Sequence, residues 1–216
     1  VALRGVDPGH ARHTGQLVHY LLADNSKVGG GADVAAGGDA FFNGGTAFDL
    51  KTGLKLGAAG AQVAVADGVL YSLHAGTLRS LDLTGAKVEI EEVIDRKALT
   101  VKKKPKWVIA ETGSAKLAKA ETFIKAGSRL YVGTTVGEVS AVELPLPADG
   151  KAAPTASWRA EVSGRPAHLL AADGRLFVVT LEGHVHCFGP GKVETKVHEL
   201  PAPPAEGPGA GGEVAR

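Results

Sequence analysis

The stretch Asp-Gly-Arg-Leu-Phe-Val-Val-Thr-Leu-Glu-Gly-His-Val-His-Cys-Phe, residues 173–188, decides the fold because the chain repeats its pattern. Residues 127–142 and 67–82 have the same order: a turn glycine, an apolar strand, a second glycine and another alternating strand. A less regular copy occupies residues 39–49. Self-similarity at such a period is typical of repeat architectures. We therefore expect the whole fold to follow from this unit.

Each copy predicts a β-hairpin. Asp-Gly is a strong turn dipeptide, because glycine accepts the positive φ that a tight hairpin requires. The residues after the first glycine are aromatic or branched, which suits a pleated sheet. Alternation in the second strand predicts one dry and one solvated face, with Val139, Ala141, Val185 and Cys187 on the dry one.

The spacing of the copies predicts the architecture. Gly68, Gly127 and Gly174 lie 59 and 47 residues apart, and a four-stranded propeller blade takes about 40–50 residues. The longer interval fits a blade with an insertion. Gly38 lies only 30 residues before Gly68, so we expect a trimmed or irregular first unit. The fold class is thus all-β, a partial β-propeller of about four antiparallel repeat units with blades of up to four strands.

The hairpins are expected to supply the middle strands of the blades, and the segments between them the outer and inner strands. Residues 157–162 have the pattern of an outer strand, and residues 166–172 have that of the next blade's inner strand.

At these residues the chain resembles the PQQ-like β-propeller repeat family. Asp49–Gly53 and Asp82–Gly85 are similar to the Asp-x-x-Thr-Gly ending of that repeat, the second with one residue fewer, and Trp107 and Trp158 to its blade-closing tryptophan. The resemblance implies structural roles for a set of turn glycines, strand aromatics and tryptophans: Gly68, Tyr71, Gly76, Trp107, Gly127, Tyr131, Gly137, Trp158, Gly174, Phe177 and Gly183.

Residues 37–45 and 126–131 resemble, more narrowly, phrases from multidomain bacterial proteins of the planctomycete kind, of the PQQ-binding-like or outer-membrane-assembly-factor-like type. This resemblance implies a periplasmic or cell-envelope location. We expect an irregular segment or blade remnant at 1–30, propeller repeats at 31–198 and a Pro/Gly-rich flexible linker at 199–216. On this interpretation the chain is a fragment of a larger protein.

Composition excludes several classes of function. The net charge of +1 gives no argument for binding nucleic acid or a charged membrane surface. The sequence has no run of 18 apolar residues, so no membrane span is predicted. A single cysteine rules out an internal disulfide.

Histidines are the candidate metal ligands. His184 and His186 would share one face of a strand and reach one metal, with Cys187 on the other face. No spacing nominates a third ligand, and the alternative is two solvated histidines beside a small buried cysteine. His10, His13 and His19 form a second group whose spacing fits no standard site. We predict no metal site, with His184 and His186 as weak candidates.

Two other motifs are interpreted as loops. Residues 29–34 lack the third glycine of a dinucleotide fingerprint and are expected to form a turn-rich connection. The basic run Lys102–Trp107 is balanced by upstream acids, so we expect a solvated inter-blade loop rather than a nucleic-acid site.

No catalytic motif is present, and G-x-S-x-G is absent. The quinoprotein dehydrogenases related to this repeat hold their quinone against an adjacent cysteine pair and a calcium ion. With one cysteine the pair cannot exist, so we predict no cofactor, PQQ included. The function expected is a non-catalytic protein-interaction or scaffolding module that contacts a protein partner and the rest of its own propeller or a following domain. The alternatives are the accessory propeller of a methyltransferase-like multidomain enzyme and part of a quinone-dependent dehydrogenase.

Overall fold

The structure is a computed structural model that describes residues 19–21, 27–29, 34–95, 100–150 and 152–191. Every regular element in these ranges is a β-strand, which confirms the all-β fold class. None of the described residues forms a helix long and apolar enough to cross a membrane. His10, His13, most of residues 29–34 and residues 192–216 lie outside the described ranges.

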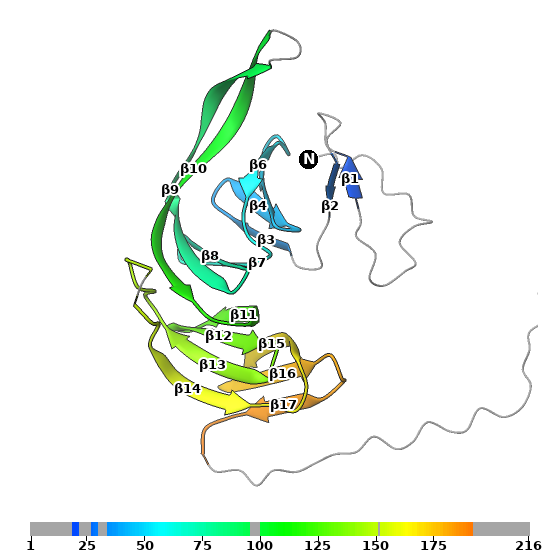
Figure 1. Cartoon of the computed structure of the whole chain (residues 1–216), viewed down its shortest axis with the longest axis vertical. Coiled ribbons are helices and arrows are strands. Elements are labelled where there is room, and N and C mark those ends of the chain that lie inside the picture. Colours follow the sequence, from blue (N-terminus) through cyan, green and yellow to red (C-terminus); the bar gives the residue numbers. More distant parts are fainter. Residues whose placement is uncertain (1–18, 22–26, 30–33, 96–99, 151, 192–216) are drawn as a thin grey trace, which may run out of the picture.

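Four antiparallel sheets form the blades of a propeller (Figure 1). Blade 1 comprises β3 (Val34–Gly37), β4 (Ala40–Asn43), β5 (Thr46–Asp49) and β6 (Lys55–Ala58). Blade 2 comprises β7 (Gln62–Ala66), β8 (Val69–His74), β9 (Thr77–Asp95) and β10 (Thr100–Lys116). Blade 3 comprises β11 (Ala120–Ala126), β12 (Arg129–Thr134), β13 (Glu138–Glu143) and β14 (Ala156–Glu161). Blade 4 has three described strands, β15 (Pro166–Ala172), β16 (Arg175–Thr180) and β17 (Val185–Phe188).

Within every blade each strand pairs with the next along the chain, so each blade is an antiparallel meander. A separate two-stranded sheet joins β1 (His19–Leu21) to β2 (Lys27–Gly29). The repeated hairpins supply the middle strands β8–β9 and β12–β13, as the repeat predicts. The outer strand β14 and the inner strand β15 also lie where the sequence places them.

The Asp-Gly dipeptides form the turns expected of them. Asp67 and Gly68 have φ values of 53° and 73°, and Asp173 and Gly174 have 50° and 69°. Two successive positive φ values define the type I′ turn, whose twist matches that of the flanking strands. Glycine is the residue that adopts such a φ without steric cost.

Blades pack on one another through a repeated pair of positions. In blade 2, Tyr71 points to blade 3 and lies in one apolar cluster with Leu130. In blade 3, Tyr131 points to blade 4 and packs on the cluster that contains Leu176. We call the surface of a blade that meets the following blade its forward face, and the opposite surface its rear face. The aromatic position lies on the forward face and the leucine position on the rear face.

Blade 1 follows the same rule, because its Phe42 shares an apolar cluster with Leu70 of blade 2. The three clusters lie between successive blades and form the core. Because blade 3 is covered on both sides, β13 has no solvated face: Val139, Ser140, Ala141 and Val142 are all buried. The expectation of one dry and one wet face in this strand was therefore wrong.

Three further expectations are corrected. The first unit is not trimmed, since blade 1 has four strands, although each has only four residues. The lysine run Lys102–Trp107 is not an inter-blade loop but part of the long strand β10. The insertion inferred from the 59-residue interval is a hairpin extension of β9 and β10 that leaves the body of the molecule (Figure 1).

The two tryptophans do not occupy equivalent positions. Trp158 in β14 pairs with Ala141, the fourth residue after Gly137. The fourth residue after Gly76 is Ser80, and its partner in β10 is Gly113. Trp107 pairs with Val88 farther out, at the base of the hairpin extension. It packs on blade 1, with its ring centroid 5.8 Å from that of Phe42.

Candidate interaction surfaces

One end of the propeller collects the turns between second and third strands and the connections between blades. The second glycine of the repeat connects these turns to the inter-blade connections. Its carbonyl accepts a hydrogen bond from the backbone N–H of the first residue after the outer strand. This bond is 2.8 Å long in three blades and joins Gly45 to Ala59, Gly76 to Leu117 and Gly137 to Val162. The repeat glycines thus fix each blade to the connection that follows it.

The approach at these glycines leaves no room for a side chain. A Cβ on Gly137, whose φ is +86°, would lie 2.7 Å from the carbonyl oxygen of Val162. Gly183 in blade 4 has a similar φ of +87°, yet a Cβ there would meet nothing within 4 Å. The difference arises because no described strand follows β17, so no connection covers Gly183.

Between blades 2 and 3 this end has an open depression of about 800 Å³, whose lining includes Thr77, Lys116, Lys119 and Glu121. Glu121 is held by Arg165, whose Nε donates to one carboxylate oxygen at 2.5 Å and whose Nη2 contacts the other. This bidentate pair lowers the pKa of Glu121 below its ordinary value. The carboxylate is therefore a charged structural partner rather than a proton donor at neutral pH.

A second hollow of about 50 Å³ lies at the same end between blades 1 and 2, next to Asn43, Gly45 and Gly60. Its lining is mostly glycine, alanine and short polar side chains. Neither hollow brings together a nucleophile and a base.

His184 and His186 lie beside each other, with ring centroids 6.2 Å apart and nearly perpendicular. The His184 Nδ1 lies 3.2 Å and the His186 Nε2 3.3 Å from the backbone oxygen of Ser163. In the described part of the chain, no group of three His, Cys, Asp or Glu side chains is placed to hold a metal. The two rings therefore contact the connection between blades 3 and 4.

Cys187 is exposed, which corrects the expectation of a buried cysteine. Val185, on the same face of β17, is 66% exposed. Alternation in the sequence predicts a dry face for both. The alternation is present, but this face of blade 4 has no described blade against it.

The hairpin extension has two chemically different faces. We define the arm as residues 87–95 of β9 and 100–108 of β10. Paired residues share a face in an antiparallel ribbon, and successive residues alternate between faces. One face carries four rows along the arm, namely Val88 with Trp107, Ile90 with Pro105, Glu92 with Lys103 and Ile94 with Val101. We call this the apolar face of the arm.

Side chains on the apolar face are open to solvent although they are hydrophobic. Ile90 is 62%, Ile94 70% and Val101 60% exposed, while Val88 is 44% exposed nearer the body. Glu92 and Lys103 form a 3.9 Å ion pair midway along the face. The apolar face thus consists of exposed aliphatic side chains interrupted by one pair of opposite charges.

The opposite face of the arm is charged. Lys87 pairs with Glu89 at 2.7 Å, and Lys106 pairs with Glu91 at 3.6 Å. The contact between Lys87 and Glu89 raises the pKa of the lysine and lowers that of the glutamate. These pairs keep this face solvated, so the arm is an amphipathic β-ribbon.

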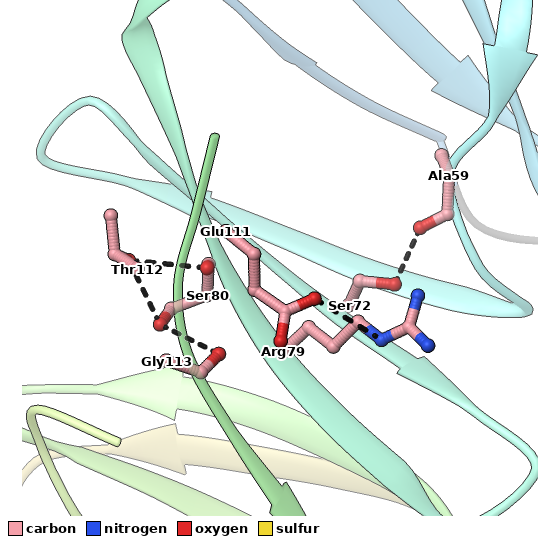
Figure 2. Close-up of polar contacts among 7 residues, drawn as sticks. All are labelled: Ala59, Ser72, Arg79, Ser80, Glu111, Thr112 and Gly113. Carbon is pink, nitrogen blue, oxygen red and sulfur yellow. Dashed lines mark hydrogen bonds and ion pairs between the residues drawn. The ribbon is translucent and has the colours of Figure 1, made fainter. Parts of the chain in front are cut away.

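Polar contacts hold β9 and β10 together within blade 2, close to the point where the arm begins. Figure 2 shows Thr112 donating to the hydroxyl of Ser80 at 3.0 Å, and Ser80 donating to the Gly113 carbonyl at 3.2 Å. Two register shifts in β10, between Val108 and Ala110 and between Glu111 and Gly113, coincide with this cluster. Such bulges bend a strand and increase its twist, and here they separate the arm from the blade.

The sequence contains a signal for the arm that the basic run conceals. From Lys87 to Ile94 charged and aliphatic residues alternate, except that Glu92 takes an aliphatic position and Val93 a charged one. From Val101 to Trp107 lysines alternate with the apolar residues Val101, Pro105 and Trp107, and Lys103 is the exception at an apolar position. Counting this period of two would have predicted strands.

No family model matches the chain, and no curated protein matches it. Among solved structures, the designed protein Ika4 is 15% identical with a TM-score of 0.48, covering 73% of this chain and 89% of that one. The designed protein Ika8 is 14% identical with a TM-score of 0.39, covering 72% and 57%. BamB from Moraxella catarrhalis is 17% identical with a TM-score of 0.39, covering 87% and 70%. All three TM-scores are below 0.5, so the description as a β-propeller rests on the sheets and the blade packing given above.

Proposed function

We propose that the chain is a non-catalytic protein-interaction module built on PQQ-like propeller repeats, and that the arm is its principal contact surface. The observation that carries this proposal is the apolar face of the arm, where Ile90, Ile94 and Val101 are each at least 60% exposed. Exposed apolar side chains gathered on one face of a protein indicate a site of interaction.

The physical argument begins with the instability of a lone ribbon. A two-stranded hairpin is only marginally stable in water unless a third strand or another surface covers its apolar face. Burial of one isoleucine or valine side chain contributes roughly 1.5–3 kcal/mol. Covering Ile90, Ile94 and Val101 would therefore supply several kcal/mol to a complex.

The polar row gives the chemistry of the partner. Glu92 and Lys103 lie between aliphatic rows, so a purely apolar surface laid along the arm would bury both charges. Burying an ion pair is costly unless its remaining hydrogen-bonding capacity is satisfied. The partner that fits is a protein surface with aliphatic side chains on both sides of a polar or oppositely charged pair.

The proposal is tested by site-specific photo-crosslinking in the native host. A crosslinker at Ile94 faces the partner, whereas one at Val93, the next residue, lies on the charged face. We expect one defined adduct from position 94, lost when Ile90→Lys is introduced, and none from position 93. Val93→Lys serves as the matched control for Ile90→Lys.

The same adduct from both positions, or its persistence in the Ile90→Lys variant, would overturn the assignment of the arm. Circular dichroism of both variants shows whether the propeller is still folded.

The resemblance to PQQ-like repeats also supports two narrower proposals. We infer an envelope location, because the relatives named by that resemblance belong there. We further infer that no quinone binds, because the one cysteine lies exposed in β17 and an adjacent cysteine pair is absent from the sequence. Titration with PQQ, followed by quenching of tryptophan fluorescence, should give no saturable signal.

A further inference from the structure

The forward face of blade 4 is an apolar surface without a described blade against it. Two cross-strand rows form it, Leu170 with Phe177 and Cys187, and His168 with Val179 and Val185. Leu170 is 61% and Val185 66% exposed. Phe177 belongs to none of the apolar clusters in the described part of the chain.

The chain itself shows what covers a surface of this kind. In blades 1, 2 and 3 the residue corresponding to Phe177 is Phe42, Tyr71 or Tyr131, and each packs against the rear face of the following blade. The same contact therefore occurs three times within one molecule. The forward face of blade 4 is a fourth copy of one side of that contact.

The complementary surface in this contact is the rear face of a blade, and in blade 1 no described blade packs on it. The rear face of blade 1 carries Val34, which is 66% exposed, and Phe41, whose ring stacks at 4.8 Å on that of Phe48; Phe48 itself is buried. Phe41 takes the place that Leu70, Leu130 and Leu176 take in the following blades. It is half-buried, whereas those three leucines are buried between blades. Blade 1 is thus the one blade whose rear face does not receive a described forward face.

We propose that a second copy of this chain covers these faces, with the forward face of blade 4 packing on the rear face of blade 1 of its neighbour. The argument is continuity with the blade-to-blade contact already present in the chain. The contact is heterologous, because the two surfaces differ. Two copies close into a ring if both contacts form at once, and more copies extend the assembly if they do not. This inference does not depend on the arm.

Cys187 provides the first measurement, since it is the one cysteine of the chain and lies on the forward face. Its alkylation rate is measured over a range of protein concentrations alongside the mass from light scattering. We expect a mass of at least two chains at high concentration and an alkylation rate at least tenfold lower there than at high dilution. A single-chain mass at every concentration, with a constant alkylation rate, would overturn the proposal.

Charged variants test which faces meet. Val185→Glu alters the forward face and Val34→Glu the rear face, so each variant alone should have the mass of one chain. An equimolar mixture retains one intact forward face and one intact rear face, and should form a 1:1 pair. Val136→Glu, at a turn residue of blade 3 that is 60% exposed, is the matched control and should assemble like the parent chain.

A mixture that stays monomeric would contradict a heterologous contact. Assembly of Val34→Glu alone would also contradict it, because forward faces would then be meeting each other. Ile90→Lys on the arm should leave the assembly unchanged. The experiments therefore test the proposal for the arm and the proposal for the contact between copies separately.

Discussion

Tyr131 and Phe177 hold the same place in consecutive repeats, yet Tyr131 packs on the apolar cluster between blades 3 and 4 while Phe177 packs on none of the clusters formed by the described residues. We expect Tyr131→Ala to lower the free energy of unfolding by about 2–4 kcal/mol, because it leaves a cavity between two blades. Phe177→Ala should cost about 1 kcal/mol, mainly through its cross-strand neighbours. Urea unfolding at a concentration where the chain is monomeric measures both. Equal losses would show that blade 4 is covered within the single chain.

The repeat glycines offer a second matched pair. Gly137→Ala and Gly183→Ala both place a side chain at a positive φ, which costs roughly 1–2 kcal/mol. Only at position 137 does the new Cβ also collide with the backbone oxygen of Val162. We expect Gly137→Ala to be the more destabilising in thermal unfolding, by at least about 1 kcal/mol. Equal effects would mean that the connection after β14 moves aside at little cost in free energy.

The carboxylate of Glu121 makes a pH-dependent contribution. Arg165 lowers its pKa in the folded state from the ordinary 4.5. A carboxyl with a depressed folded pKa adds stability above its unfolded pKa, and this stability is lost as the pH falls through the folded pKa. The free energy of unfolding should therefore decrease as the pH drops below about 4.5.

The size of this decrease is set by solvent screening, because both side chains of the pair are more than a third exposed. We expect at most about 1 kcal/mol. In Glu121→Gln the corresponding part of the pH profile should be missing, as seen by subtracting the two stability curves. A variant profile parallel to that of the parent would show that the contact adds nothing.

Ser72 links blade 2 to the connection from blade 1, and its hydroxyl donates to the carbonyl of Ala59 at 2.5 Å (Figure 2). Ser72 is buried, so Ser72→Ala leaves that carbonyl without this donor. Loss of one partner from a buried pair costs about 1–3 kcal/mol. We expect a decrease of this size in chemical unfolding and faster hydrogen exchange at Ala59 and Gly60. Thr84→Ala, in a solvent-exposed contact with Asp82 within β9, is the control and should change the unfolding free energy by less than about 0.5 kcal/mol.

The sequence was sufficient where local chemistry and tertiary packing agree. Asp67-Gly68 and Asp173-Gly174 specify their turns whatever surrounds them, so the hairpins and the number of repeats could be predicted. The wet and dry assignment failed because it depends on neighbours. Val139 and Val142 lie on opposite faces of one strand and are both buried, since blades flank both sides.

The arm shows the opposite difficulty. Its lysines dominate the composition, and a run of like charges is typical of a loop, so the sequence predicts a loop although Val101, Pro105 and Trp107 fall at alternate positions. The position of Trp107 could not be found by comparing repeats, because two register shifts in β10 displace it from the row of Trp158. Cys187 is exposed because no described blade covers its face of blade 4, and the local sequence pattern carries no information about that.

The direction in which the aromatic residues point has a consequence for how such a molecule folds and unfolds. Because the apolar clusters join successive blades, folding cooperativity depends on contacts between neighbouring blades rather than on one shared core. Opening should then begin at blade 1 or blade 4 and proceed inward, with blades 2 and 3, each packed on both sides, exchanging their amides last. The same polarity makes a blade a modular part: one more copy with an aromatic in front and a leucine behind would lengthen the series without redesign of its neighbours.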